Sequence, residues 1–81
     1  MKRWINESVD ISDFADRLPR SVFELFEEAE EAERKGEEFA YYEICDNIDI
    51  AGKLLATEGV ITDEEWDKMC QKYSPYIEIE E

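Results

Sequence analysis

The sequence contains no histidine among its 81 residues. Histidine is the commonest general base and metal ligand, and serine and cysteine nucleophiles usually depend on it for activation. Paired carboxylates do acid and base work only where their environments separate their pKa values, and nearly all carboxylates here fall on the polar sides of predicted helices. We therefore expect a protein that is not an enzyme and that holds no cofactor.

Basic residues are scarce: 9 Lys and Arg stand against 23 Asp and Glu, which gives a net charge of -14 at pH 7. So large a net charge exceeds what solubility requires, and the acidic side chains repel one another in the folded state. It also repels nucleic acid and anionic membranes, so we expect neither as a direct partner. The partner class that this charge favours is a basic protein.

Cysteines and long apolar runs are few. Cys45 and Cys70 both fall on apolar faces of predicted helices, which indicates two reduced core thiols rather than a disulfide or a zinc site. No run approaches the roughly 20 apolar residues of a membrane helix. The segment Met1–Asn6 is not followed by the apolar stretch of a signal peptide. These features predict a cytoplasmic location.

What the sequence does contain is enough apolar material for a core, since 43% of its residues are hydrophobic, too many for a disordered tail. Periodicity predicts one all-α domain over residues 1–81, a small bundle of about four helices. Two of these helices are short and two are longer, forming an antiparallel hairpin. The predicted helices cover about 10–18, 21–35, 37–58 and 62–73, with a tail over 74–81.

Local signals place the helix ends. Asp10 or Ser12 can cap the first helix, and Pro19 closes it. Capping boxes over residues 21–24 and 62–65 predict the starts of the second and fourth helices. Glycines at 36 and 59 predict the ends of the second and third.

The predicted helix 21–35 separates into an apolar face and an acidic face. The apolar face holds Val22, Leu25, Phe26, Ala29 and Ala32. The opposite face holds Glu24, Glu27, Glu28 and Glu31, at spacings of three and four residues.

The predicted helix 37–58 has a broad core stripe and further apolar residues behind it. The stripe holds Tyr41, Ile44, Cys45, Ile48, Ala51, Gly52 and Leu55. Phe39, Ile50 and Leu54 lie on the far side. The helix is therefore either central in the bundle or part of an interface.

The alternation of apolar and charged residues over 76–81 predicts a short strand, and the segment around Trp4 and Ile5 is its expected pairing partner.

Residues 54–73 follow a recognisable order: a leucine pair, a glycine, an apolar pair, a threonine, acidic residues, an aromatic residue and a later lysine. The residues are Leu54, Leu55, Gly59, Val60, Ile61, Thr62, Asp63, Glu64, Glu65, Trp66 and Lys72. This order resembles the short carboxy-terminal helical-hairpin domain known as SHOCT, in which Phe or Tyr usually takes the place of Trp66. The resemblance implies an assembly or interaction module and transfers no catalytic residue.

The acidic face of helix 21–35 is the candidate partner-binding site. Carboxylates at these spacings lie roughly 5 to 6 Å apart, not far above the 3.4 Å base rise of one nucleic-acid strand. Each such like-charge pair lowers the stability of the helix by roughly 0.2 to 0.5 kcal/mol, so the acidic face destabilises the fold. Phe23 and Tyr42 are candidate apolar anchors beside it.

Asp46 and Asp49 continue the acidic surface. Together with Glu43 they suggest a hard-cation site, but their spacing does not match a calcium loop, so we expect no metal.

Two functions fit these features. The first is an inhibitor or regulator that occupies the basic, nucleic-acid-binding surface of a partner, as DNA mimics do. Small acidic anti-CRISPR and anti-restriction proteins of phages and mobile elements are its physical analogues. The second is a self-associating structural or adaptor module that forms a homodimer through Phe39, Ile50 and Leu54, with the charge maintaining solubility.

Overall fold

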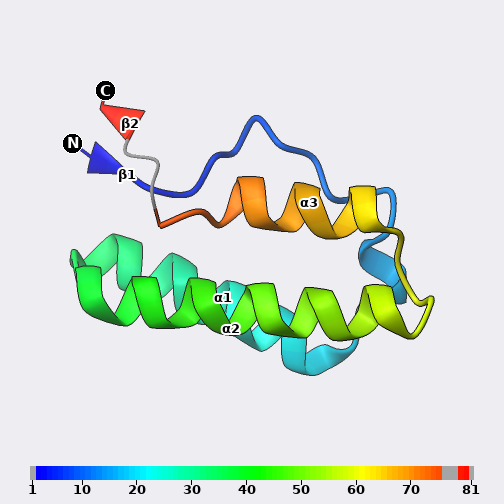
Figure 1. The fold of residues 1–81 in the computed structure, drawn as a ribbon. Helices are drawn as coiled ribbons and strands as arrows, with labels where there is room; N and C mark the ends of the chain where they lie inside the picture. The colour runs from blue at the N-terminus through cyan, green and yellow to red at the C-terminus, as the bar shows by residue number, and fades with distance from the viewer. Residues whose placement is uncertain (1, 76–78, 81) are drawn as a thin grey trace.

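The computed structural model describes residues 2–75 and 79–80. These contain three α-helices, α1 (Arg20–Lys35), α2 (Glu38–Thr57) and α3 (Asp63–Lys72). Helices α1 and α2 lie side by side as an antiparallel hairpin, and α3 packs on α2 (Figure 1). The predicted all-helical class and the hairpin are confirmed, whereas the predicted count of four helices is wrong for the described chain.

The two ends of the described chain meet in a short antiparallel ribbon. Strand β1 (Lys2–Arg3) pairs with β2 (Ile79–Glu80), with Lys2 opposite Glu80 and Arg3 opposite Ile79. The two arrows lie together in Figure 1. Most of the expected tail strand, residues 76–78 and 81, lies outside the described residues. Trp4 and Ile5, the expected pairing region, are buried in the core directly after β1.

The predicted first helix over 10–18 is wrong. Only Ala15–Arg17 form one turn of 3-10 helix, and turns precede it. The Asp10 carboxylate accepts a hydrogen bond from the Ser12 backbone N–H at 2.9 Å, which offers the chain a local turn in place of a helix. Phe14 and Leu18 are nevertheless buried, as their apolar spacing indicated.

The predicted capping box at the start of the second helix is also wrong. Helix α1 begins at Arg20, one residue earlier than predicted, with Pro19 as its N-cap and no side-chain cap. Ser21 therefore lies inside the first turn, where it cannot act as the N-cap. The Glu24 carboxylate lies 3.8 Å from the Arg20 guanidinium, one turn earlier on the helix.

The other helix boundaries follow the sequence signals. Gly36 caps α1 in the left-handed conformation at φ 71°, where a side chain would be strained. Thr62 and Glu65 form the predicted capping box of α3, with hydrogen bonds of 2.8 and 3.1 Å. Hydrogen bonding from the Thr62 backbone lowers the pKa of the Glu65 carboxyl.

The core lies where α1, α2, α3 and the amino-terminal segment meet. Its fully buried side chains include Phe14, Val22, Tyr41, Ile48 and Met69. Trp66 of α3 packs directly on Gly52 of α2, where a Cβ would lie 2.5 Å from Trp66 Cδ1. The amino-terminal segment is tied to α3 by Asn6 N–H donating to the Lys72 carbonyl at 2.9 Å. The predicted core stripe of α2 is confirmed at Tyr41, Cys45, Ile48 and Gly52.

Among the described residues, none of the helices combines the length and apolar character needed to cross a membrane.

Candidate partner-binding surface

The acidic face of α1 lies opposite the core, as the spacing predicted. Val22, Phe26, Ala29 and Ala32 are buried, while Glu24, Glu27 and Glu28 are exposed and Glu31 is half-buried. The helix thus presents four carboxylates in two adjacent rows on its outer side. We call these four residues the acidic face of α1.

Cations of the same helix reach only the two ends of this face. Glu24 is near Arg20, and Glu31 pairs with Lys35 at 3.3 Å and with Arg34. No ion pair within the described residues involves Glu27 or Glu28. The centre of the face is therefore its least neutralised part. Exposed pairs of this kind contribute little to stability, about 0 to 1 kcal/mol each.

The two candidate apolar anchors lie on different helices. Phe23 is 38% exposed on α1, and its ring packs edge-on against Phe26 with centroids 5.9 Å apart. Tyr42 is 40% exposed on α2, and its hydroxyl donates to Glu38 Oε1 at 3.1 Å. Both rings keep accessible surface while being held in place by neighbours.

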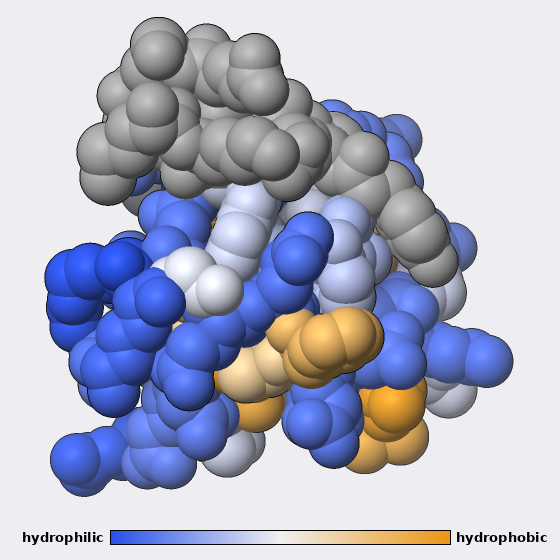
Figure 2. All heavy atoms as spheres, turned by 90° about the vertical axis from the view of Figure 1, so that its left-hand side faces the viewer, coloured by the Kyte–Doolittle hydropathy of each residue, from blue (hydrophilic) through white to orange (hydrophobic). Residues whose placement is uncertain are grey.

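Helix α2 leaves a second surface open. Phe39 is 87% exposed, Ile50 64% and Leu54 61%, although α2 packs against both α1 and α3. Figure 2 views the end of the molecule that holds the turn between α1 and α2, and shows hydrophobic patches separated by hydrophilic side chains. The sequence left two alternatives for α2, a central helix or an interface helix. The structure places it centrally and still leaves these three side chains uncovered within the described chain.

Asp49, predicted to belong to the acidic partner surface, is used within the fold. Its Oδ1 accepts hydrogen bonds from Trp66 Nε1 at 3.0 Å and from Cys70 Sγ at 3.1 Å. The carboxylate thus joins α2 to α3. This role of Asp49 was not predicted from the sequence. The available signal was Trp66, because a partly buried indole N–H usually requires a hydrogen-bond acceptor. Asp46, three residues earlier, is exposed.

Glu33 has a second internal role that the sequence reading missed. Its Oε2 accepts the backbone N–H groups of Trp4 at 2.7 Å and Ile5 at 2.8 Å, fixing the amino-terminal segment on α1. The signal was present in the helical phase, since Glu33 follows Val22 by about three turns and so falls on the core side. A carboxylate at a core phase indicates an internal acceptor.

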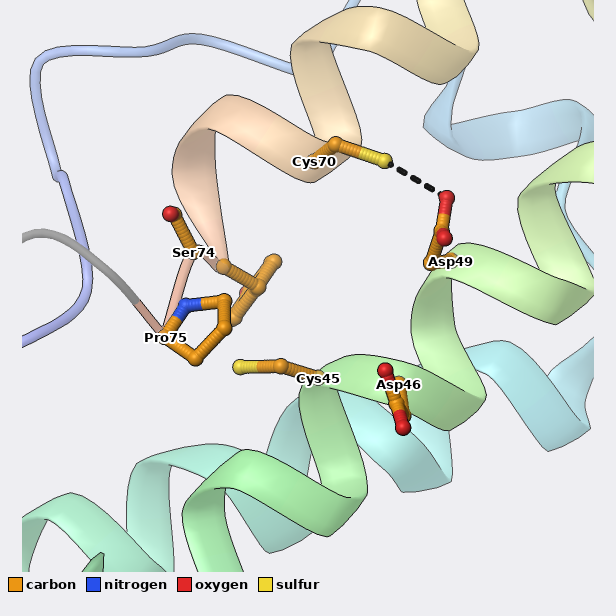
Figure 3. A pocket seen from close by; sticks show the side chains of 7 residues that line it. Cys45, Asp46, Asp49, Cys70, Ser74 and Pro75 are labelled. Carbon is orange, nitrogen blue, oxygen red and sulfur yellow. Dashed lines mark hydrogen bonds between the residues drawn. The ribbon is translucent and has the colours of Figure 1, made fainter.

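A shallow pocket of about 260 Å³ lies between α2 and α3. It is lined by Cys45, Asp46, Asp49, Cys70, Tyr73, Ser74 and Pro75. Figure 3 shows side chains from both helices directed toward this pocket, with the Cys70 thiol donating a hydrogen bond to Asp49.

Neither thiol in this pocket is activated. Burial raises the pKa of Cys45 to about 11. Burial and, to a smaller degree, the hydrogen bond to Asp49 raise the pKa of the Cys70 thiol to about 12. Both thiols are therefore protonated at neutral pH, which disfavours nucleophilic attack and metal ligation. Both cysteines are free, and Cys45 is buried as predicted, whereas Cys70 is only half-buried.

The acidic residues do not gather into a metal site. Within the described residues, no group of three or more His, Cys, Asp or Glu side chains is arranged to hold an ion. The exposed carboxylates of α1 and α2 are instead spread along the two helices.

Comparisons with protein-family models, curated proteins and solved structures found no match to this chain. The resemblance of residues 54–73 to the SHOCT hairpin stays a prediction.

Proposed function

We propose that this chain is a non-catalytic, acidic binding protein that occupies the basic, nucleic-acid-binding surface of a partner protein. The observation that supports this most is the acidic face of α1, whose central residues Glu27 and Glu28 are exposed and have no cation beside them in the described chain. The helix fixes the backbone from which these carboxylates project, so only their side chains have to be ordered on binding.

The net charge supports the same proposal. At -14, the chain attracts a basic surface over distances of about a Debye length, roughly 8 Å at physiological salt. Such attraction accelerates association and makes it strongly dependent on ionic strength. An inhibitor of a nucleic-acid-binding protein benefits from both properties, because it must compete with a polyanion for the same surface.

A pull-down from a lysate of the encoding organism, followed by competition, tests this function. We expect a bound basic protein that is released by raised salt and displaced by duplex DNA or RNA. A partner that stays bound when nucleic acid occupies its own site would contradict the proposal, because the two ligands would then not share a surface.

A second candidate function is self-association, favoured by the exposure of Phe39, Ile50 and Leu54. In this case the three side chains would be covered by another copy of the chain, and the carboxylates would keep the assembly soluble. Sedimentation of the chain at high concentration distinguishes the two: a dimer that Leu54→Asp dissociates would favour this function over the first.

A further inference from the structure

The outer side of α2 holds a stripe of five residues with a defined order. Phe39, Glu43, Asp46, Ile50 and Leu54 are all exposed and share one side of the helix. We call these residues the outer stripe of α2. Three of them are the most exposed large apolar side chains of the described chain, at 87, 64 and 61%.

The stripe is apolar at both ends and acidic in the middle. Phe39 and Ile50 are separated by about 16 Å along the helix axis, and Leu54 extends the stripe to about 22 Å. Glu43 and Asp46 fill the interval, and neither forms an ion pair within the part of the chain that the structure describes. A complementary surface therefore needs cations at its centre and apolar contacts at both ends.

Charge determines which occupant fits this surface. A second copy of the chain would bring two molecules of net charge -14 together, with Glu43 and Asp46 near the contact. A stable dimer commonly buries about 800 Å² on each partner, about 20 to 30 residues a side, of which this stripe supplies a small part. A basic partner gains from the same carboxylates that a second copy must overcome.

We propose that the outer stripe of α2 binds a basic amphipathic helix of the partner protein, with arginine or lysine opposite Glu43 and Asp46 and apolar side chains against Phe39, Ile50 and Leu54. This inference rests on the proposed function and deepens it, because it names the element of the partner that is bound. Helices that lie along nucleic acid are basic on the side facing the phosphates, so they have the charge that this stripe requires.

The stripe and the acidic face of α1 have different roles in this arrangement. The acidic face attracts by charge alone and does not distinguish one basic surface from another. Apolar contacts at the ends of the stripe give a preference among basic surfaces, because exposed apolar side chains bind favourably only where the partner buries them.

Two synthetic helical peptides of equal charge test this preference. The first has arginine in the middle of one face and leucine at both ends of that face. The second has serine in place of each leucine. We expect calorimetric titration of the chain to show affinity for the leucine peptide at least about tenfold higher than for the serine peptide. Raised salt should weaken both.

Ile50→Ser with Leu54→Ser is the deciding variant, and these exposed positions leave the core intact. It should lose most of the preference for the leucine peptide and keep only the part that Phe39 contributes at the other end of the stripe. Amide chemical shifts on adding the leucine peptide should change along residues 39–54 more than on α3. The matched charge comparison is Glu43→Gln with Asp46→Asn, expected to weaken binding more than Asp13→Asn with Glu58→Gln.

Three outcomes would overturn the inference. Equal, salt-dependent binding of the two peptides, unchanged by the serine variant, would remove it and leave the proposed function standing. If neither peptide binds at low salt, the result counts against both the inference and the charge-driven function. A dimer of the unchanged chain that the serine variant dissociates would assign the stripe to a second copy.

Discussion

On the side of α2 that packs against α3, the Asp49 carboxylate accepts hydrogen bonds from Trp66 and Cys70. On the outer face of α1, the Glu27 and Glu28 carboxylates have no cation or hydrogen-bond donor beside them among the described residues. The two regions use the same chemical group. In the first it joins two helices, and in the second it is left for solvent or a partner.

This difference shows that the net charge of the chain is not one uniform surface property. Glu33, Asp49 and Glu65 each satisfy donors of the fold. The carboxylates in the middle of the acidic face of α1 satisfy none in the described chain. We therefore expect substitutions in the inner region to change stability and substitutions on the outer face to change binding.

Gly52→Ala should have the largest effect on stability, because its Cβ would lie 2.5 Å from Trp66 Cδ1 at the contact between α2 and α3. Overpacking of this kind costs about 1 to 3 kcal/mol. Urea unfolding measures the loss, with Asn47→Ala on the exposed side of α2 as the control. Stability at or above that of the unchanged chain would mean that the clash costs no more than the roughly 0.5 to 1 kcal/mol gained by replacing a glycine inside a helix.

Glu33→Ala should follow, because it leaves the backbone N–H groups of Trp4 and Ile5 without their acceptor. Buried donors that lose a partner cost about 1 to 3 kcal/mol. Glu27→Ala is the matched control and should be nearly neutral. Amide exchange of residues 4 and 5 should accelerate in the first variant only, and equal exchange in both variants would refute the proposed role of Glu33.

Asp49→Ala should cost about 1 kcal/mol, since Trp66 is partly exposed and water can replace the lost acceptor. Tryptophan fluorescence should shift as the environment of Trp66 changes. Asp46→Ala, three residues earlier on α2, should alter neither stability nor fluorescence. If both alanine variants behave alike, Asp49 does not join the helices in solution.

Glu27→Gln with Glu28→Gln should have the opposite sign. Removing like charges at spacings of three and four raises stability by roughly 0.2 to 0.5 kcal/mol for each pair that is relieved. Thermal unfolding at low salt resolves this gain, and added salt should reduce it. A clear loss of stability would show that these side chains have an internal role after all.

Features that depend on neighbouring residues could be predicted from the sequence. Gly36 ends α1 and the Thr62–Glu65 box starts α3, because both signals act within a few residues. The exposure of Phe39, Ile50 and Leu54 also followed from helical periodicity. The two faces of α1 were recovered for the same reason.

Features that depend on distant residues could not be predicted in this way. The hydrogen bonds that Glu33 accepts from Trp4 and that Asp49 accepts from Trp66 join residues far apart in the chain. Helical phase places Glu33 on the core side of α1, but it does not identify the donors that the carboxylate binds, and it gives no sign of the contact between Asp49 and Trp66.

The expected helix over 10–18 failed for a local reason, because the Asp10 carboxylate accepts the Ser12 backbone N–H in a turn that competes with a helix.

Two variants with equal net charge test the central claim most directly. One replaces the acidic face of α1, as Glu24→Gln, Glu27→Gln, Glu28→Gln and Glu31→Gln. The other replaces four exposed carboxylates elsewhere, as Asp13→Asn, Glu58→Gln, Glu64→Gln and Asp67→Asn. Both are compared with the unchanged chain for capture of the nucleic-acid-displaceable partner. We predict that the first variant loses the partner and the second retains it. Equal retention or equal loss by the two variants would contradict the claim that this face is the binding surface.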